Sequence, residues 1–504
     1  MTMIFIILGK YEGVERSLDE IQNIEVHLIR LRTITKHKGI KIIFNMIELL
    51  RGGNQMSRIA LVGENSIKYI NILLDIWNSG NCAVLLDWRI PMSTAYEMME
   101  KAKVTKCYID ESVSKKITNS DYPNVEFIEY QSNGNVAVRL PNEIYNKFID
   151  NYTGDEAVVI YSSGTTGKSK GVILSHFAIN TNADAIQNYM DLTSDDCLYI
   201  CKSLSHSSSL IGEMLVALKY KIPIVVAPTI VPPRFVLDNI AGFKVTTLCL
   251  NPTLLKMYSE EVQRKSYEIS SLRTIYVSGS ILTDKLYEIS HNAFYGVPIY
   301  NVYGLSEAGP RVTAQRADCC KNNSVGKPIK SVEIAVIGDD GQVLPNGSHG
   351  IVHINTQTIY SGYISGGEKN KTLYKGWLNS GDIGFIDENG ELHIADRIDD
   401  LIIINAHKIC PSDVERVILE NTMVTECIVT DYVITKTNTV SLGCVYVSKT
   451  DLSVKDIRQL GKILSSYEIP RYYLRVKELP KNRNGKILRN EVAKQLVQGR
   501  TDEQ

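Results

Sequence analysis

The stretch SRIALVGENSIKYINILLDIWNSGNCAVLLD, residues 57–87, decides the class of fold. It begins with an apolar run that predicts a buried strand, and a polar turn leads into a segment with the apolar spacing of an amphipathic helix. Gly80 predicts the end of that helix, and a second apolar strand follows. The succession of strand, helix and strand is typical of an α/β sheet with crossover helices.

The same alternation recurs in CLYICKSLSHSSSLIGEMLVALKYKIPIVVAP (197–228) and in VTTLCLNPTLLKMY (245–258). We therefore expect a large α/β body that extends at least from residue 57 to about residue 310. After Gly326 the pattern changes to short strands with Asp-Gly and Asn-Gly pairs, which are typical of hairpins in antiparallel sheets.

The C-terminal segment has the pattern of a small α+β domain. DDLIIINAHKICPSDVERVILE predicts a strand and then a helix that begins after Pro411, with Ser412 as its cap. We expect a large domain over residues 1–396 and a small domain over residues 400–504, joined by a hinge near residues 396–400, where Asp399 stands.

Composition restricts the class of protein. The 504 residues are enough for two or more domains. Lysine plus arginine (55) nearly balances aspartate plus glutamate (56), which argues against a nucleic-acid partner. Ten cysteines without a C-x-x-C pair predict reduced thiols in a cytoplasmic protein. The apolar start MTMIFIILGK is too short for a membrane span and predicts a buried strand.

The segment YSSGTTGKSKGVILSH, Tyr161–His176, contains Gly-Lys-Ser, the end of a Walker-type phosphate loop. The Walker pattern needs a glycine five positions before Gly167, and Ser162 stands there. Apolar strands are predicted on both sides of the loop, whereas a Walker loop leads into a helix. An anion here would be met by Lys168, Lys170, hydroxyls and backbone N–H groups. Of two interpretations, a solvated hairpin and a mobile loop that holds a departing polyphosphate, the sequence favours the second.

Five segments, in order over residues 57–492, resemble motifs of the adenylate-forming superfamily, which includes acyl-CoA synthetases, aryl-acid ligases, peptide-synthetase adenylation domains and firefly luciferase. YSSGTTGKSKG is similar to its phosphate loop, NVYGLSEAG (301–309) to its adenine and magnesium motif, and NSGDIG (379–384) to its ribose motif. ADRIDDLIIINAHKICPSDVE (395–415) is similar to its hinge and thiolation loop, and PKNRNGKILRNEV (480–492) to its catalytic-lysine loop.

The resemblance implies two doubly wound sheets plus a distorted β-barrel, followed by a small, mobile C-terminal α+β domain. It also implies that Lys486 stabilises the reacting α-phosphate, that Glu307 binds Mg²⁺, and that His206 belongs to the catalytic site beside the acid. The nucleotide-binding residues that it implies are Ser162, Ser163, Gly164, Thr165, Thr166, Gly167, Lys168, Lys170, Tyr303, Gly304, Ser306, Asp382 and Arg397.

Several of these residues have implied individual roles. Tyr303 would lie against the adenine, and Gly304 would leave room for the acyl group. Asp382 would accept hydrogen bonds from both ribose hydroxyls, because one carboxylate has two oxygens. Arg397 would bind ribose or phosphate, and the hydroxyl of Ser306 would bond phosphate.

The match is weaker in the thiolation loop, where the family usually has glycine at the position of Ala406 and a polar or basic residue at that of Ile403. Residues 1–56 match poorly. The segment around His206 lacks the aspartate with which amino-acid-activating members meet an α-ammonium group. The resemblance therefore favours a fatty or aryl acid without an α-amine.

The leading hypothesis is an ATP- and Mg²⁺-dependent ligase that forms an acyl-adenylate and transfers the acyl group to coenzyme A or to the phosphopantetheine of an acyl or peptidyl carrier protein. An enzyme that passes the adenylate to an amine, or that activates an amino acid, is the closest alternative. A non-catalytic nucleotide-binding protein and a P-loop NTPase represent different classes, and the failed Walker spacing argues against the latter.

Overall fold

The computed structural model describes most of the chain after residue 55. The described residues are 56–115, 122–132, 134, 136–150, 152, 155–162, 170–229, 231–317, 324–364, 373–374, 376–404, 407–434, 439–481 and 487–501. All the elements below belong to one compact unit, Ser57–Gln504. The strand expected in MTMIFIILGK lies outside the described residues.

The strand–helix–strand unit predicted at residues 57–87 is confirmed as β1 (Arg58–Gly63), α4 (Ile67–Asn78) and β2 (Cys82–Asp87). Ser66 caps α4, because its hydroxyl accepts a hydrogen bond of 3.0 Å from Tyr69 N. Gly80 turns the chain out of the helix with a φ of 71°. β1 and β2 then pair in parallel, as a crossover connection requires.

β1 and β2 lie in the middle of a seven-stranded sheet. Its strands in spatial order are β17 (Gly362–Tyr363), β7 (Lys170–Leu174), β6 (Val158–Ser162), β2, β1, β3 (Lys106–Asp110) and β4 (Glu126–Tyr130). The helices in this part of the chain are α4, α5 (Met92–Lys101), α6 (Glu111–Ser114), α7 (Asn142–Lys147) and α8 (His176–Met190).

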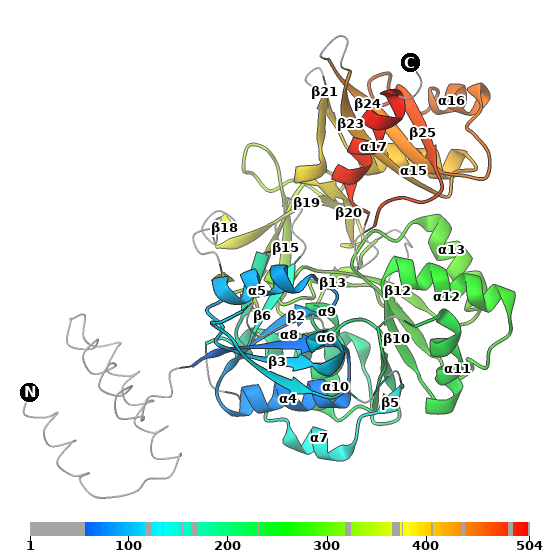
Figure 1. The fold of residues 1–504 in the computed structure, drawn as a ribbon. Helices are drawn as coiled ribbons and strands as arrows, with labels where there is room; N and C mark the ends of the chain where they lie inside the picture. Colours follow the sequence, from blue (N-terminus) through cyan, green and yellow to red (C-terminus); the bar gives the residue numbers. More distant parts are fainter. Residues whose placement is uncertain are drawn as a thin grey trace, which may run out of the picture. The chain divides into compact units, whose positions relative to one another are not determined.

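A second, eight-stranded sheet follows in the chain and confirms the predicted α/β alternation. Its order is β14 (Lys327–Pro328), β13 (Thr313–Ala314), β12 (Ile299–Tyr303), β11 (Thr274–Val277), β10 (Thr247–Leu250), β8 (Leu198–Ile200), β9 (Ile224–Val226) and β5 (Val138–Arg139). The helical elements are α9 (Ser207–Ser209), η2 (Leu210–Leu215), α10 (Val216–Tyr220), α11 (Pro233–Phe243), α12 (Pro252–Arg264), α13 (Asp284–Ala293) and η3 (Ser306–Ala308). Figure 1 shows α11, α12 and α13 along one side of β10 and β12.

One apolar core joins these two sheets. Buried Leu61 and Leu85 from the first sheet belong to the same cluster as Leu198 and Val226 from the second. The helices α4, α8, η2 and α10 also contribute buried residues to this cluster. The relative position of the two sheets is therefore fixed by a shared core.

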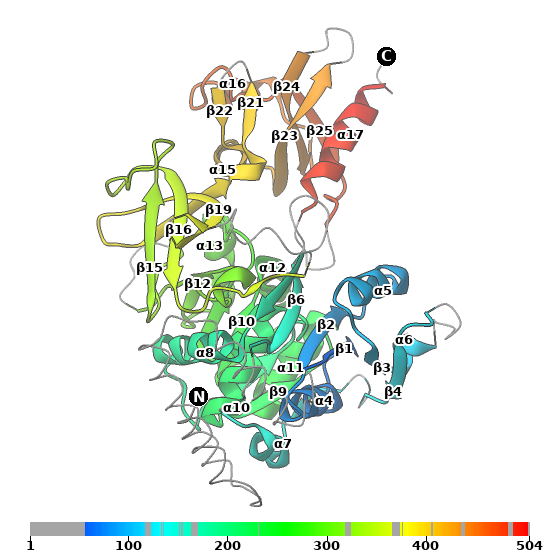
Figure 2. The same ribbon diagram turned by 90° about the vertical axis from the view of Figure 1, so that its left-hand side faces the viewer.

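The hairpins predicted after Gly326 form a third, antiparallel sheet of five described strands. Figure 2 shows β15 and β16 of this sheet side by side. The strands are β15 (Val332–Ile337), β16 (Gly350–Thr356), β19 (Trp377–Ile386), β18 (Leu373–Tyr374) and β20 (Leu392–Arg397). The Asn389-Gly390 turn between β19 and β20 uses a positive φ of 76° at the glycine, as its sequence predicts.

The C-terminal elements form a small α+β arrangement. They are η4 (Ile398–Asp400), β21 (Ile402–Ile404), β22 (His407–Ile409), α15 (Pro411–Asn421), β23 (Glu426–Ile434), β24 (Thr439–Val447), α16 (Val454–Leu460), β25 (Tyr472–Val476) and α17 (Arg489–Thr501). Both α15 and α17 pack against β23 (Figure 2). In the part of the chain that the structure describes, no helix is long and apolar enough to cross a membrane.

The predicted cap of α15 was wrong. The helix begins at Pro411, and Cys410 occupies the N-cap position. The Ser412 hydroxyl instead donates a hydrogen bond of 2.5 Å to Ala395 O and lies 2.8 Å from a carboxylate oxygen of Asp396. The Ser412 hydroxyl bonds to β20 and is therefore not used to cap the helix. The helix begins one residue earlier because proline is favoured at the first helical position.

Gly326→Ala should destabilise the fold more than Gly347→Ala. Both glycines have positive φ angles, 78° and 82°. A Cβ at Gly326 would lie 2.1 Å from the carbonyl carbon and oxygen of Ala314, whereas one at Gly347 would meet no atom within 4 Å. We expect a loss of about 1 kcal/mol for Gly347→Ala from backbone strain alone. For Gly326→Ala we expect roughly 3 kcal/mol or more, because backbone must move.

Thermal unfolding followed by circular dichroism measures this difference. Equal unfolding temperatures for the two variants would show that the close approach at Gly326 does not constrain the fold.

Candidate functional site

The phosphate-loop motif connects two antiparallel strands. Ser162, the last residue of β6, pairs with Lys170, the first residue of β7. The Ser175 hydroxyl caps the following helix α8 by accepting a hydrogen bond of 3.1 Å from Ala178 N. This arrangement confirms the prediction that the loop joins strand to strand, unlike a Walker loop. Ser163, Gly164, Thr165, Thr166, Gly167 and Lys168, with the Ser162 side chain, lie outside what the structure describes.

Tyr363 joins two of the predicted site residues, Glu307 and Lys170. Its hydroxyl donates a hydrogen bond of 2.9 Å to Glu307 Oε1, and the Lys170 ammonium lies 5.3 Å from the centre of its ring. Burial and the charge of Glu307 raise the pKa of Tyr363 far above its usual range, so the hydroxyl stays a donor. One aromatic side chain thereby contacts a carboxylate through its hydroxyl and a cation through its ring.

Sequence reasoning missed Tyr363. The residue lies on β17, which pairs with β7 at the edge of the first sheet, whereas Glu307 follows β12 of the second sheet. No local spacing connects these segments. The tyrosine in SGY was the available signal, since the hydroxyl of a buried tyrosine usually has a hydrogen-bond partner.

A second group consists of Tyr303, Asp382 and Arg397, which the structure also brings together. The Tyr303 hydroxyl donates a hydrogen bond of 2.5 Å to Asp382 Oδ2. Arg397 Nη1 lies 3.5 Å from Asp382 Oδ1, since Asp382 on β19 pairs with Arg397 on β20. Burial and the nearby carboxylate raise the pKa of Tyr303 well above its usual value. The predicted adenine, ribose and border residues therefore form one contact group.

Gly304 and Ser306 lie between these two groups. A Cβ on Gly304 would lie 1.8 Å from Pro310 O, so glycine is required by the close approach of the chain to itself. The structure thus gives a reason for glycine at this position that does not involve an acyl group, and the role of Gly304 beside the acyl group stays a prediction. The Ser306 hydroxyl lies 2.9 Å from that of Ser207, which immediately follows His206.

His206 precedes α9 in an extended backbone conformation, with φ −101° and ψ 138°. Its side chain is 29% exposed, and its Nε2 lies 3.9 Å from a carboxylate oxygen of Asp87. The Ser207–Ser306 contact places it one residue from the loop that carries Glu307. The predicted acid-site histidine and the predicted metal ligand therefore belong to neighbouring segments.

The C-terminal motifs are only partly described. Lys486 and Ala406 lie outside the described residues. Ile403 on β21 is 65% exposed, and the His407 ring on β22 stacks on Tyr467 at 4.1 Å between ring centres. The roles assigned to Lys486 and to the thiolation loop stay predictions.

The residues around Glu307 fit a magnesium ion bound chiefly through phosphate. Among the described residues, no group of three or more His, Cys, Asp or Glu side chains could hold a metal. Magnesium commonly binds through one or two carboxylates plus the phosphates of its nucleotide. The buried Tyr363 hydroxyl orients the Glu307 carboxylate, a hard oxygen ligand of the required kind.

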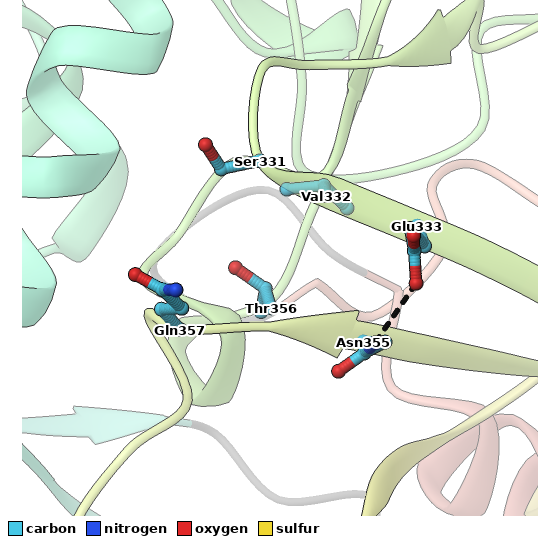
Figure 3. A pocket seen from close by; sticks show the side chains of 6 residues that line it. All are labelled: Ser331, Val332, Glu333, Asn355, Thr356 and Gln357. Carbon is cyan, nitrogen blue, oxygen red and sulfur yellow. Dashed lines mark hydrogen bonds between the residues drawn. The ribbon is translucent and has the colours of Figure 1, made fainter.

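A hollow of about 600 Å³ lies elsewhere, between the beginning of β15 and the end of β16 (Figure 3). Its lining residues are Ser331, Val332, Glu333, Asn355, Thr356 and Gln357. Figure 3 shows the hydrogen bond of 2.9 Å between the Glu333 and Asn355 side chains across the two strands. This lining includes no cation to meet a phosphate, so the hollow does not fit the predicted nucleotide chemistry.

The sequence matches the AMP-binding enzyme family over residues 45–364. The 2-succinylbenzoate–CoA ligase of Bacillus cereus strain AH820 is 27% identical over 450 residues, which are 89% of this chain and 90% of that relative. The 2-succinylbenzoate–CoA ligase of Bacillus cereus strain Q1 is 28% identical over 488 residues, or 96% of each chain.

Solved structures share the fold. The anthranilate CoA ligase AuaEII in complex with anthranoyl-AMP superposes with a TM-score of 0.76 at 20% identity, covering 91% of this chain and 90% of that chain. The O-succinylbenzoate coenzyme A synthetase (MenE) from Bacillus subtilis in complex with ATP and magnesium has a TM-score of 0.74 at 24% identity, covering 88% and 91%. The α/β fold with several sheets that the resemblance implies is confirmed.

Tyr363→Phe should weaken the Mg²⁺-dependent binding of ATP. The variant keeps the ring under Lys170 and removes the hydrogen bond to Glu307 Oε1. Hydrogen bonds to charged groups contribute about 1.5–3 kcal/mol, and we expect part of this to appear as a roughly three- to tenfold loss of affinity. Calorimetric titration of ATP at several Mg²⁺ concentrations measures the effect.

Tyr145→Phe is the matched control, because the Tyr145 hydroxyl donates a hydrogen bond of 2.8 Å to Ile222 O and takes no part in this group. An unchanged Mg²⁺ dependence in Tyr363→Phe would mean that Tyr363 does not orient the carboxylate.

Proposed function

The chain belongs to the AMP-binding enzyme family, and we propose that it is an ATP-dependent ligase that converts a carboxylic acid to its adenylate and transfers the acyl group to coenzyme A. One observation carries the proposal. The group Glu307–Tyr363–Lys170 and the group Tyr303–Asp382–Arg397 are connected by the short segment from Tyr303 to Glu307.

The first group fits the polyphosphate of ATP. A carboxylate becomes a good electrophile only when one of its oxygens becomes a good leaving group, which AMP supplies. This step brings two anions together, so cations and fixed dipoles must surround them. Lys170 would face the phosphates at the base of the loop, and Glu307 would hold Mg²⁺. When bound, magnesium neutralises charge on the phosphate oxygens.

The second group fits the nucleoside. Asp382 would accept hydrogen bonds from the ribose hydroxyls, and Arg397 would donate to ribose or phosphate from β20. The Tyr303 hydroxyl is turned to Asp382, which leaves its ring face for contact with the adenine.

We propose that the acid is an aryl acid without an α-amine. The acids for which the similar ligases are named, 2-succinylbenzoate and anthranilate, are both aryl acids. The segment CKSLSHSSSL around His206 offers no aspartate for an α-ammonium group. His206 and the hydroxyl groups that follow it would face the acid near the Ser306 contact.

Coenzyme A is the proposed acceptor, because the relatives are CoA ligases. The phosphopantetheine of a carrier protein has the same thiol arm and is the alternative acceptor. Lys486 would stabilise the α-phosphate during adenylation and move away afterwards with the C-terminal elements. We place the reaction in the cytoplasm, which suits the free thiols of the described cysteines.

An acid-dependent exchange of labelled pyrophosphate into ATP tests the adenylation step. We expect exchange with at least one aryl acid and none with amino acids across a panel of fatty, aryl and amino acids. Coenzyme A added to the active acid should then yield a thioester. If no acid supports exchange, the ligase proposal is wrong.

Lys486→Ala should lower the exchange rate by roughly a hundredfold or more, as for the removal of one charge-stabilising group from an active site. Lys494→Ala is the matched control, because Lys494 is 66% exposed and pairs with Glu491 on the surface of α17. Equal rates for Lys486→Ala and the wild type would remove Lys486 from the mechanism.

A further inference from the structure

The carboxyl ends of strands from both large sheets meet beside His206. β1 and β2 of the first sheet end at Gly63 and Asp87, and β8 and β9 of the second end at Ile200 and Val226. Side chains that follow these four strands make contacts from one sheet to the other. Ligands of α/β proteins bind at such strand ends.

Asn65 fixes the backbone that leads to His206. Its Nδ2 donates a hydrogen bond of 2.8 Å to Lys202 O, and its Oδ1 accepts one of 2.9 Å from Leu204 N. The Lys202 ammonium lies 3.1 Å from Glu213 Oε1, and both side chains are at least 90% buried. The segment that carries His206 is therefore held by Asn65 from the first sheet and by Glu213 from η2.

Asp87 presents a fixed negative charge to that ring. Arg89 donates hydrogen bonds to it from Nε at 2.8 Å, from Nη2 at 2.5 Å and from its backbone N at 3.0 Å. Burial alone would raise the pKa of the Asp87 carboxyl, but these bonds and the charge of Arg89 hold it below its usual value. The carboxylate is thus ionised and locked in orientation.

The same oxygen that accepts from Arg89 Nη2 also faces the histidine. Asp87 Oδ2 lies 3.9 Å from His206 Nε2, which is too long for a hydrogen bond in the ligand-free protein but close enough for a charge to act on the ring. Catalytic contacts in ligand-free structures are often longer than in the complex. On the other side, the Ser207–Ser306 contact of 2.9 Å ties the histidine segment to the Glu307 loop.

We propose that Asp87 is a positioning residue that orients His206 toward the acid substrate. The inference rests on the proposed function, and it assigns to β2 a role in the site that no motif covers. The Asp87 carboxylate favours the staggered rotamer of the imidazole in which an N–H at Nε2 points toward it. With Asp87 in place, Nε2 is turned to the first sheet and the ring is kept beside the Ser306 loop, where the acid carboxylate would arrive.

The test is a double-mutant cycle in the pyrophosphate exchange assay, on the full-length protein with the acid that the panel identifies. The variants are Asp87→Asn, Asp87→Ala, His206→Ala and Asp87→Ala with His206→Ala. We expect Asp87→Ala and His206→Ala each to raise the KM for the acid about tenfold, which is about 1.4 kcal/mol. This lies within the range of coupling energies between residues in contact. The KM for ATP should stay within about twofold.

The decisive result is the double variant. If Asp87 acts through His206, removing both should cost no more than removing His206 alone. Additive losses would overturn the proposal, and so would equal losses of acid and ATP affinity in Asp87→Ala, which would indicate a structural role. Asp87→Asn, which keeps the shape and removes the charge, replaces Asp87→Ala in the cycle if the latter unfolds.

Glu64→Gln is the matched control. Glu64 is also a carboxylate at a strand end, after β1, where it accepts hydrogen bonds from Thr229 N and Oγ1 at 3.0 and 3.2 Å. Its replacement should leave the KM for the acid unchanged. Absence of exchange with every acid in the wild type would refute the proposed function, whereas exchange with additive losses would refute only the positioning by Asp87.

Discussion

The hydrogen bond from Tyr363 to Glu307 ties the second sheet to the first at the point where the predicted site lies. The rest of its segment strengthens this link. Tyr360 N donates to Glu307 O at 2.9 Å, and the Thr358 hydroxyl donates to Ala308 O at 2.7 Å. Ser361 N then donates to Ile173 O in β7 of the first sheet. One short segment therefore holds a charged carboxylate beside the strand that follows the phosphate loop.

This link explains why the Glu307 loop can be so tightly folded. Gly304 allows Pro310 O to approach within the space of a side chain, and the loop between them is closed on one side by the Thr358 and Tyr360 contacts. A loop fixed in this way loses little conformational freedom when a ligand binds. The conformational entropy lost in ordering this loop is offset during folding by the shared apolar core that positions the two sheets.

Local signals in the sequence predicted most of the elements around the site. Gly80 ends α4 because it acts on its own neighbours, and the Asn389-Gly390 turn of the third sheet behaves likewise. Ser412 is the instructive error. A serine hydroxyl that local sequence predicts as a helix cap can instead bond to residues far along the chain. Here the Ser412 hydroxyl contacts Ala395 and Asp396.

The contacts between segments were not predictable from spacing. Neither Tyr363 nor Asp87 belongs to a recognised motif. Tyr363 contacts Glu307, and Asp87 approaches His206, only when the two sheets pack together. The motif residues were found by resemblance, and the structure then grouped Tyr303 with Asp382 and Arg397. Periodicity identifies elements, whereas the partner of a polar side chain depends on tertiary packing.

The Tyr303–Asp382 bond also bears on how a nucleotide would enter. An ionised carboxylate offers about four lone-pair sites. The Tyr303 hydroxyl takes one on Oδ2, and Arg397 lies 3.5 Å from Oδ1, so each oxygen of the carboxylate has a protein group beside it. Because Asp382 is buried, the hydroxyl and the guanidinium replace water around it before any ligand arrives. A ribose that bound here would therefore meet a carboxylate whose orientation the protein has already fixed, which lowers the entropic cost of binding.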